Sequence, residues 1–202
     1  MIIKNHKKYW KNRKIDWNQA YFNLDHPHRD LIIRALRGMK FATVYEIGCG
    51  AGANLYKIQQ TFGVRVGGID INPDAIEEAK KHLRIDSIME ASDIDSIFMN
   101  DKSVDVLLSD MTLIYIGPLK MRKVMKEIVR ITRRHILLVE FHSTSFWKRL
   151  RLYFKTGYFS YNYRKLLEKY GFYDVEAYKL KEEDWPGGEP QKTFGYIIKA
   201  KI

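Results

Sequence analysis

The sequence predicts an α/β domain in which a doubly wound, mostly parallel β-sheet carries helices on both faces. Short runs rich in Val and Ile alternate with segments of helical period from residue 41 to residue 175, a pattern typical of parallel sheets with crossover helices. A glycine-rich segment follows the first of these runs, where a strand would bend into a helix. Residues 173–202 contain two β-like runs around turn-forming residues, which indicate an antiparallel hairpin.

The size and composition fit one globular domain, because the chain has 202 residues, 46% of them hydrophobic and 29% charged. Its single cysteine, Cys49, excludes an internal disulfide and a cysteine-based zinc site. The first residues place charge where a signal peptide would need its apolar stretch, and no apolar run is long enough to span a bilayer. We therefore expect a cytoplasmic protein.

The chain is strongly basic, with a net charge of +11 at pH 7. The basic residues gather in the stretches 4–14, 120–134 and 148–169. Such a charge favours a polyanionic partner, such as RNA or an anionic membrane surface, without defining any chemistry. A solvated basic surface is the simpler explanation of any one stretch, so nucleic acid and membrane stay open as partners.

The order of the elements predicts a single domain with four parts. An N-terminal helical arm and helix occupy residues 1–40, a cofactor-binding core 41–142, a basic aromatic insert 143–165, and a C-terminal helix end with the hairpin 166–202. The strands of the core are predicted at 43–47, 65–69, 87–90, 104–109 and 136–141, and those of the hairpin at 173–180 and 194–202, around a turn at residues 185–188.

Two helices of the core have clear starting signals. Pro73 stands where a first helical turn accepts proline, and apolar residues recur behind it at helical spacing. Pro118 opens a second helix in the same way. The apolar stripe predicted for this second helix consists of Leu119, Val124, Ile128 and Ile131.

The glycine-rich segment that begins at Glu46 indicates a ligand site. Glycine adopts dihedral angles barred to other residues and lets a ligand approach the backbone. Asp70 ends the next predicted strand, at the spacing of about 20 residues from which a carboxylate can bind ribose hydroxyls. Gly48, Gly50 and Ala53 also fit the looser dinucleotide-binding pattern. Glu46 argues against it, because an acid there would repel a pyrophosphate but attract the sulfonium and ammonium groups of S-adenosylmethionine.

The ordered motifs resemble those of class I S-adenosylmethionine-dependent methyltransferases over residues 40–200. The motifs are Glu46-Ile-Gly-Cys-Gly-Ala-Gly52, Gly68-Ile-Asp70, Ala91-Ser-Asp93-Ile94 and Val104-Asp105-Val-Leu-Leu-Ser109. The resemblance implies a Rossmann-like fold, with the hairpin adding an antiparallel strand, and S-adenosyl-L-methionine as cofactor with S-adenosyl-L-homocysteine as product. The cofactor-binding residues it implies are Glu46, Gly48, Cys49, Gly50, Gly52, Asn54, Asp70, Ile71, Asp93, Ile94 and Ser109.

Within that set, the resemblance implies separate roles. The glycines would line the methionine part of the cofactor, and Asp70 would bind the ribose. Ile71 would pack on the adenine, whose edge Asp93 and Ile94 would recognise.

Three residues are candidates for catalysis. Side chains that follow the fourth and fifth strands face the ligand crevice of such a sheet. This nominates Asp110, Thr112 and Tyr115 after the fourth strand and Glu140, His142 and Ser143 after the fifth, and from these we select Asp110, Tyr115 and His142. We take His142 as the first choice for a general base because histidine titrates near neutrality. The alternative is that His142 only caps its strand or faces solvent.

The missing motifs favour a small-molecule acceptor, methylated on oxygen or nitrogen. A cytosine-C5 mechanism needs a catalytic cysteine, and the only cysteine lies in the glycine loop. Ser109-Asp110-Met111 resembles part of the ribosomal RNA ribose 2′-O-methyltransferases, but the lysine and glutamate of their catalytic tetrad are missing. An RNA methyltransferase, and a non-catalytic protein that keeps the fold and binds RNA or a membrane surface, are the alternatives.

Two aromatic-rich segments are expected to border the site. The N-terminal arm, with Trp10, Trp17 and Tyr21, is expected to cover the cofactor, with docking on the outside of the sheet as the alternative. The insert 143–165 mixes aromatic and basic residues without an acid and is expected to form a mobile lid suited to an anionic or aromatic acceptor. Its alternative is a core-packing helix with a basic outer face, for which the spacing of four residues is suitable: Phe146, Leu150, Tyr153 and Phe154.

Overall fold

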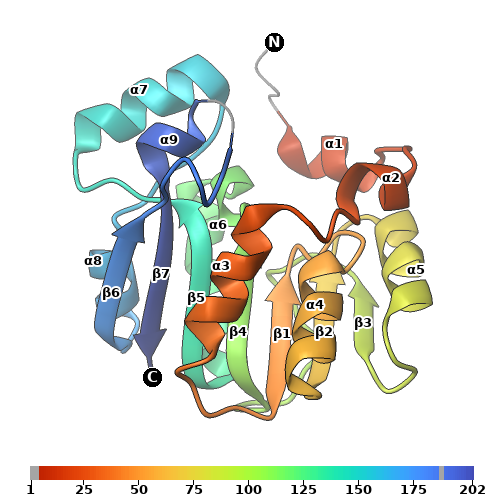
Figure 1. The fold of residues 1–202 in the computed structure, drawn as a ribbon. Coiled ribbons are helices and arrows are strands. Elements are labelled where there is room, and N and C mark those ends of the chain that lie inside the picture. Colours follow the sequence, from red (N-terminus) through yellow and green to blue (C-terminus); the bar gives the residue numbers. More distant parts are fainter. Residues whose placement is uncertain (1–4, 187–188) are drawn as a thin grey trace.

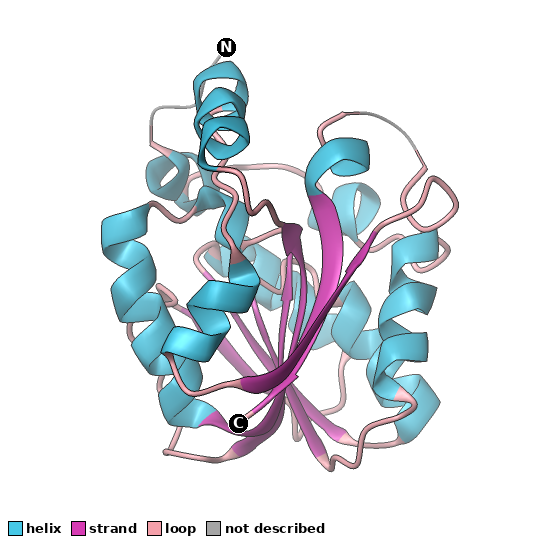
Figure 2. Ribbon diagram, turned by 90° about the vertical axis from the view of Figure 1, so that its left-hand side faces the viewer, coloured by secondary structure: helices cyan, strands magenta, loops and turns pink. Residues whose placement is uncertain are grey.

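The computed structural model describes residues 5–186 and 189–202 and shows a central β-sheet between two layers of helices (Figure 1; Figure 2). The predicted turn residues Gly187 and Gly188 lie outside the described residues. The strands are β1 Thr43–Ile47, β2 Arg65–Asp70, β3 Ile88–Ala91, β4 Val104–Asp110, β5 Thr132–Phe141, β6 Tyr173–Lys179 and β7 Gly195–Lys201. The helices are α1 His6–Lys11, α2 Trp17–Tyr21, α3 Pro27–Leu36, α4 Ala53–Phe62, α5 Pro73–His82, the short 3₁₀ helix η1 Leu113–Tyr115, α6 Pro118–Ile131, α7 Phe146–Thr156, α8 Tyr163–Lys169 and α9 Gln191–Phe194.

The strand order confirms the predicted doubly wound fold. The described sheet runs β3-β2-β1-β4-β5-β7-β6, with β1 to β5 parallel and β7 antiparallel to both of its neighbours. The chain moves outward from β1 to β3 and then returns to β4 on the other side of β1, which makes the gap between β1 and β4 the switch point where such sheets bind ligands. Ile47 pairs with Ile69 and Ser109, so three strands end level at this point.

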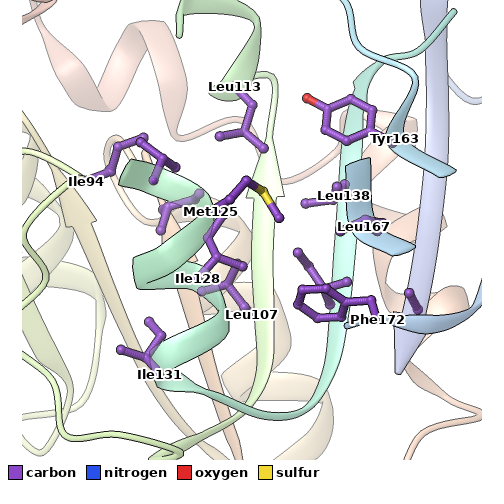
Figure 3. Packing of buried hydrophobic residues seen from close by; sticks show 14 of the residues in the cluster. Ile94, Leu107, Leu113, Met125, Ile128, Ile131, Leu138, Tyr163, Leu167 and Phe172 are labelled. Carbon is purple, nitrogen blue, oxygen red and sulfur yellow. The ribbon is translucent and has the colours of Figure 1, made fainter. Parts of the chain in front are cut away.

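The core lies in two clusters, one on each face of the sheet. On one face, side chains of α6 and α8 pack on β4 and β5; Figure 3 shows Met125, Ile128 and Leu167 meeting Leu107 and Leu138 there. The opposite cluster joins α3, α4 and α5 to the other side of the same strands. The strands between these clusters are buried on both sides, which explains why they read as nearly continuous apolar runs.

The helices begin where their capping residues predict, with one difference in an apolar stripe. Asn72 caps α5 by accepting hydrogen bonds from the N–H groups of Asp74 and Ala75 at 2.9 and 3.3 Å, and Pro73 is the first residue of the helix. In α6 the predicted stripe is wrong at Leu119, which is 82% exposed. The buried face of that helix consists of Met121, Val124, Met125, Ile128 and Ile131.

The C-terminal pair differs in detail from the predicted hairpin. β6 and β7 are antiparallel neighbours as expected, but residue 194 closes a short helix, α9, and β7 begins one residue later. β5 also starts at Thr132, earlier than the predicted 136. Among the described residues, no helix combines the length and apolarity needed to cross a membrane.

Candidate active site

A cavity of about 500 Å³ lies at the carboxyl ends of the central strands. Glu46 of β1, Asp70 of β2 and Asp110 of β4 contribute to its lining. Trp10 and Trp17 of the N-terminal arm border it from above, where Figure 1 shows α1 and α2 beyond the ends of the strands. The volume falls in the range of small-molecule sites, about 300–1,000 Å³.

The glycine loop has the backbone conformation that its sequence predicts. Gly48, Gly50 and Gly52 all have positive φ values, of 71°, 52° and 80°, which favour glycine. A Cβ atom on Gly48 would lie 2.0 Å from Thr112 Oγ1, so only glycine fits there. Gly50 borders the cavity and has no atom within 4 Å of its Cβ position. The loop therefore forms a tight backbone cradle that is open on the ligand side.

Asp70 is fixed by the same loop. Its Oδ2 atom accepts a hydrogen bond from the Gly50 N–H at 3.0 Å, and its Oδ1 atom accepts one from the Asn72 N–H at 2.9 Å. Burial raises the pKa of Asp70 above its ordinary value, although the backbone donors of Asn72, Gly50 and Ile71 act in the opposite direction. Each carboxylate oxygen keeps a lone pair with which it can accept a ligand hydroxyl.

Asn54 joins two buried acids on the floor of the cavity. Its Nδ2 group donates to Glu46 Oε1 at 2.7 Å and to Asp110 Oδ2 at 2.9 Å. Its Oδ1 atom accepts from Arg29 at 2.6 Å. Within the described part of the chain, Glu46 Oε2 and Asp110 Oδ1 are buried without a hydrogen-bond partner. Two unpartnered carboxylate oxygens at a cavity wall fit a cationic or hydrogen-bonding ligand.

The two acids differ in their electrostatic state. Burial, reinforced by Asp110, raises the pKa of Glu46 well above its ordinary value against the opposing effects of Asn54 and Arg29. Burial also pushes the pKa of Asp110 upward, but His28, Asn54 and Arg29 together bring it below its ordinary value. Of the two acids, Glu46 therefore holds its proton to higher pH, and Asp110 ionises more readily.

A histidine pair beside Asp110 was not predicted from the sequence. His28 Nε2 lies 2.8 Å from Asp110 Oδ2, and the Nδ1 atoms of His28 and His26 are in hydrogen-bond contact. Trp185 packs on both imidazoles, with ring centroids 4.4 Å from His28 and 5.1 Å from His26. Both histidines line the cavity. Their sequence signal was only a histidine on each side of Pro27 ahead of a helix, which says nothing about contact with a strand end 82 residues away.

The N-terminal arm is held against the site by specific bonds. Asn72 Nδ2 donates to the carbonyl oxygens of Trp10 and Arg13, both at 2.8 Å. His6 Nε2 bonds the carbonyl oxygen of Gly157 at 3.0 Å, and the ring of Trp10 lies 5.4 Å from that of Tyr115. The arm therefore lies at the cavity rather than on the outside of the sheet.

Asp93 and Ile94 lie in the cavity wall, as do most of the predicted cofactor-binding residues: Glu46, Gly48, Cys49, Gly50, Asn54, Asp70 and Ile71. The Asp93 carboxylate is in ion pairs with Lys7, at 2.8 Å, and Lys120. Burial would raise the pKa of Asp93, but these two lysines hold it below its ordinary value. The carboxylate retains acceptor positions beyond those that two lysines use.

Two predicted cofactor-binding residues do not line the cavity. Gly52 is the N-cap residue of α4, and a Cβ atom there would lie 3.0 Å from the side chain of Ala79, on the side of the loop that faces α5. Ser109 is fully buried in β4 and donates from Oγ to Glu140 Oε1 at 2.7 Å. Both residues were predicted from the order of the motifs. Motif order does not show which residues of a segment face the ligand and which pack behind it.

Glu140 supports the loop that follows β4. Its Oε1 atom also accepts from the N–H groups of Thr112 and Leu113, both at 2.9 Å. The side chain is fully buried, outside the cavity lining. Burial raises its pKa to about 7 in spite of these donors. Glu140 is thus a positioning residue that fixes the segment carrying Asp110.

Of the three predicted catalytic residues, Asp110 and Tyr115 lie at the cavity and His142 does not. His142 Nδ1 accepts a hydrogen bond from the Tyr163 N–H at 3.2 Å, and its backbone forms a bridge with Tyr161. Its side chain therefore tethers the chain after α7 to β5. Burial, with a contribution from Tyr158, raises the pKa of Tyr115, which makes its hydroxyl a hydrogen-bond donor rather than a base.

Comparison with known proteins agrees with this architecture. Residues 44–135 match the family model described as Methyltransferase domain. Sequence comparison with curated proteins finds no significant match. The matched segment, which is slightly less than half of the chain, is thus similar to a methyltransferase domain, and the strand order agrees with the Rossmann-like fold of these enzymes.

Solved structures with a similar fold include methyltransferases with different names and acceptors. A putative methyltransferase of Haloferax volcanii, in complex with the Trm112 methyltransferase activator, has a TM-score of 0.71 at 18% identity and covers 99% of this chain and 98% of its own. Geranyl diphosphate C-methyltransferase of Streptomyces coelicolor A3(2) has a TM-score of 0.66 at 13% identity, over 86% of this chain and 74% of its own. Magnesium protoporphyrin IX methyltransferase of Synechocystis PCC 6803 has a TM-score of 0.64 at 15% identity, over 94% and 89%. The last two were solved with S-adenosylhomocysteine.

Proposed function

We propose that this methyltransferase transfers the methyl group of S-adenosylmethionine to an oxygen or nitrogen of a small-molecule acceptor. One observation carries the proposal. A single cavity combines a glycine loop and Asp70, which suit the donor, with a His26–His28–Asp110 chain that suits removal of a proton from an acceptor. A non-catalytic role does not need such a chain of titratable groups.

The donor would be held by the residues of the β1, β2 and β3 ends. The loop at Gly48 and Gly50 would accommodate its methionine part, Asp70 its ribose hydroxyls, and Ile71 with Ile94 its adenine. The unpartnered oxygen of Glu46 suits the amino acid ammonium group. When bound, S-adenosylmethionine supplies an activated methyl group on a positively charged sulfur. The protein's own contribution is then to position the acceptor and to accept its proton.

The histidine chain explains how a proton could leave. The Asp110 carboxylate only accepts, so His28 Nε2 carries the hydrogen between them, and one proton lies between the two Nδ1 atoms. When that proton moves to His26 Nδ1, which then gives up the hydrogen bond it accepts from the His28 N–H at 3.4 Å, the Nε2 atom of His26 is free to take a proton from the acceptor. The Nδ1 proton then passes to His28, and the resulting positive charge lies beside Asp110, which stabilises it.

Burial, together with His28 and Arg29, lowers the pKa of His26, so His26 is neutral and able to act as a base at neutral pH. We predict that kcat/KM loses an acidic limb below pH 6.5 when His26 is replaced by Gln, with a rate lower by about 10²–10⁴ at the optimum. The pH–rate profile with a confirmed acceptor measures this. His142→Gln is the matched control and should keep the acidic limb; loss of the limb in that variant alone would assign the base to His142 instead.

Donor binding and acceptor choice are tested separately. Asp70→Ala should weaken S-adenosylhomocysteine binding by about tenfold to a hundredfold, because it removes a buried partner of hydroxyl groups. Calorimetry on the folded variant measures this. Transfer of a labelled methyl group is then compared for small-molecule extracts and for RNA, with and without a Trm112-type activator, since the similar Haloferax protein is in complex with one. Label in RNA only would overturn the small-molecule assignment.

A further inference from the structure

The helix α7 presents its aromatic residues to solvent rather than to the core. Ser145 caps the helix, which ends at Gly157 with a φ of 79°. Leu152 is the one fully buried residue of the described helix and packs beside Ile114 and Phe141. Four aromatic side chains are exposed to 58%, 74%, 41% and 67%, in the order Phe146, Trp147, Tyr153 and Phe154. This result contradicts the alternative of a core-packing helix, whose core face would have included three of these residues.

The exposed aromatic residues form one continuous stripe. At about 100° per residue, residues 146, 147, 150, 153 and 154 cover an arc of about 120° that lies opposite Leu152. Neighbouring rings are in contact, with centroids 5.5 Å apart for Phe146 and Trp147 and 5.8 Å apart for Tyr153 and Phe154. Leu152 thus anchors one side of α7 to the body of the protein, and the exposed aromatic stripe lies on the opposite side of the helix. Figure 1 shows α7 at the edge of the molecule, beyond the end of β5.

Cations flank the stripe, and no acid offsets them. Arg151 lies beside one edge of it, with Lys155 and Lys148 exposed further round the helix, and Arg149 lies beside the other edge, 6.0 Å from the Phe146 ring. None of these four is in an ion pair with another described residue. The segment from residue 143 to residue 163 contains no Asp or Glu.

We propose that α7 is an interfacial helix that docks this protein on an anionic lipid bilayer. A helix with Trp and Phe on one face and Lys and Arg beside them lies in the plane of a membrane interface, with its apolar side among the acyl chains and its cations at the headgroups. The convex, outward-facing stripe favours a bilayer over single-stranded RNA, whose bases stack on aromatic groups along a basic groove. The charge complementarity selects anionic over neutral lipid.

Docking in this way would also orient the active site. Tyr158, two residues beyond the end of α7, lines the cavity, and the Gly157 carbonyl oxygen is bonded to His6 of the arm. An acceptor at the bilayer surface would therefore meet the cavity beside the docked helix. This last step rests on the proposed function, whereas the docking itself does not.

Vesicle sedimentation tests the docking. The full chain should bind vesicles of phosphatidylcholine mixed with phosphatidylglycerol at low ionic strength and should not bind phosphatidylcholine alone. Replacing Lys148, Arg151 and Lys155 with Gln should weaken binding by roughly a hundredfold, because each cation near an anionic surface contributes about 1 kcal/mol, a factor of about five. The combined variant Phe146→Ser, Trp147→Ser and Phe154→Ser should abolish binding while keeping S-adenosylhomocysteine affinity.

Matched controls separate α7 from general surface properties. Phe98 is 93% exposed on another part of the surface, and Phe98→Ser should leave vesicle binding unchanged. The triple variant Arg122→Gln, Lys123→Gln and Lys126→Gln removes the same charge from the exposed face of α6 and should change binding by less than threefold, about the effect of net charge at a distance. Equal loss in the α6 and α7 charge variants would overturn the proposal.

Two further outcomes are decisive. Absence of binding to anionic vesicles at low ionic strength would overturn the proposal, as would α7-dependent binding of a uridine oligonucleotide that anionic vesicles do not displace. Calorimetry with S-adenosylhomocysteine on the same samples reports the donor site independently. Vesicle binding without binding of S-adenosylhomocysteine would therefore contradict the proposed enzyme function but support the docking proposal.

Discussion

At the scale of single residues, the most informative group is Glu46, whose carboxyl is fully buried with its pKa raised well above the ordinary value. A cationic ligand group stabilises the ionised form, so binding of S-adenosylhomocysteine, which carries an ammonium group, should release a proton from Glu46 at neutral pH. Affinity should accordingly increase as pH rises. Calorimetry in buffers of different ionisation enthalpy measures the released proton directly.

Glu46→Gln is the matched variant for this experiment, because glutamine can keep the hydrogen bond that Glu46 Oε1 accepts from Asn54. It should bind the ligand without proton release and with an affinity independent of pH. A proton release of the same size in the variant would show that another group, such as Asp70, is the source.

Glu140 gives a second prediction, which concerns stability. Its folded-state pKa is raised from 4.5 to about 7, so the folded chain holds this proton more tightly than the unfolded chain. The stabilising contribution is complete below pH 4.5 and is lost as pH rises to about 7. The shift corresponds to about 3 kcal/mol in the free energy of unfolding.

Chemical denaturation at several pH values, with Glu140→Gln as the comparison, checks this expectation. Glutamine does not titrate, so the difference in unfolding free energy between parent and variant should change across the window from pH 4.5 to about 7. All other acids are present in both proteins, so their contributions to the pH dependence cancel in this difference. A difference that stays constant across that window would contradict the raised pKa.

At the scale of elements, the N-terminal arm depends on one side chain of the β2–α5 turn. Asn72 donates two hydrogen bonds to the arm through Nδ2 and caps α5 through Oδ1. Asn72→Asp keeps the cap and removes both donors. We expect the arm to open more often and S-adenosylhomocysteine to dissociate about tenfold faster, given about 0.5–1.5 kcal/mol for each lost bond.

Stopped-flow dissociation and limited proteolysis of residues 5–24 measure the two effects. Asn72→Ser also keeps a cap without adding charge, so it distinguishes loss of the donors from repulsion by a new carboxylate near Asp70. A dissociation rate equal to that of the parent in both variants would show that the arm is held by its aromatic contacts alone.

At the scale of the whole molecule, local patterns predicted the sheet and the glycine loop because each is encoded by neighbours in sequence. Val and Ile runs indicate buried strands, and glycine is required where a side chain such as Thr112 leaves no room for a Cβ atom. Contacts across the fold were not predictable in this way. The His28–Asp110 pair joins residues 82 apart, and no spacing rule connects a helix start with a distant strand end.

The errors have the same physical origin. Helical periodicity shows that the aromatic residues of α7 share a face, but it does not show whether that face meets the core or the solvent. For the same reason, Leu119 of α6 was predicted to lie on the buried face of the helix, although it is exposed. His142 follows a strand that ends near the cavity, yet its ring turns toward Tyr163, because the backbone after α7 returns to pair with it. The division into arm, core, insert and hairpin segments remains a prediction.

The Asn54 side chain has a kinetic consequence. One amide group donates to both Glu46 and Asp110. When the methyl donor places a positive charge beside Glu46, the hydrogen bond from Asn54 to Asp110 therefore changes as well. We therefore expect the donor to bind first and the acceptor second, because the ammonium group of the donor changes the charge at Glu46 and, through Asn54, the hydrogen bonding of Asp110. Product inhibition patterns would then show S-adenosylhomocysteine competing with the donor and not with the acceptor.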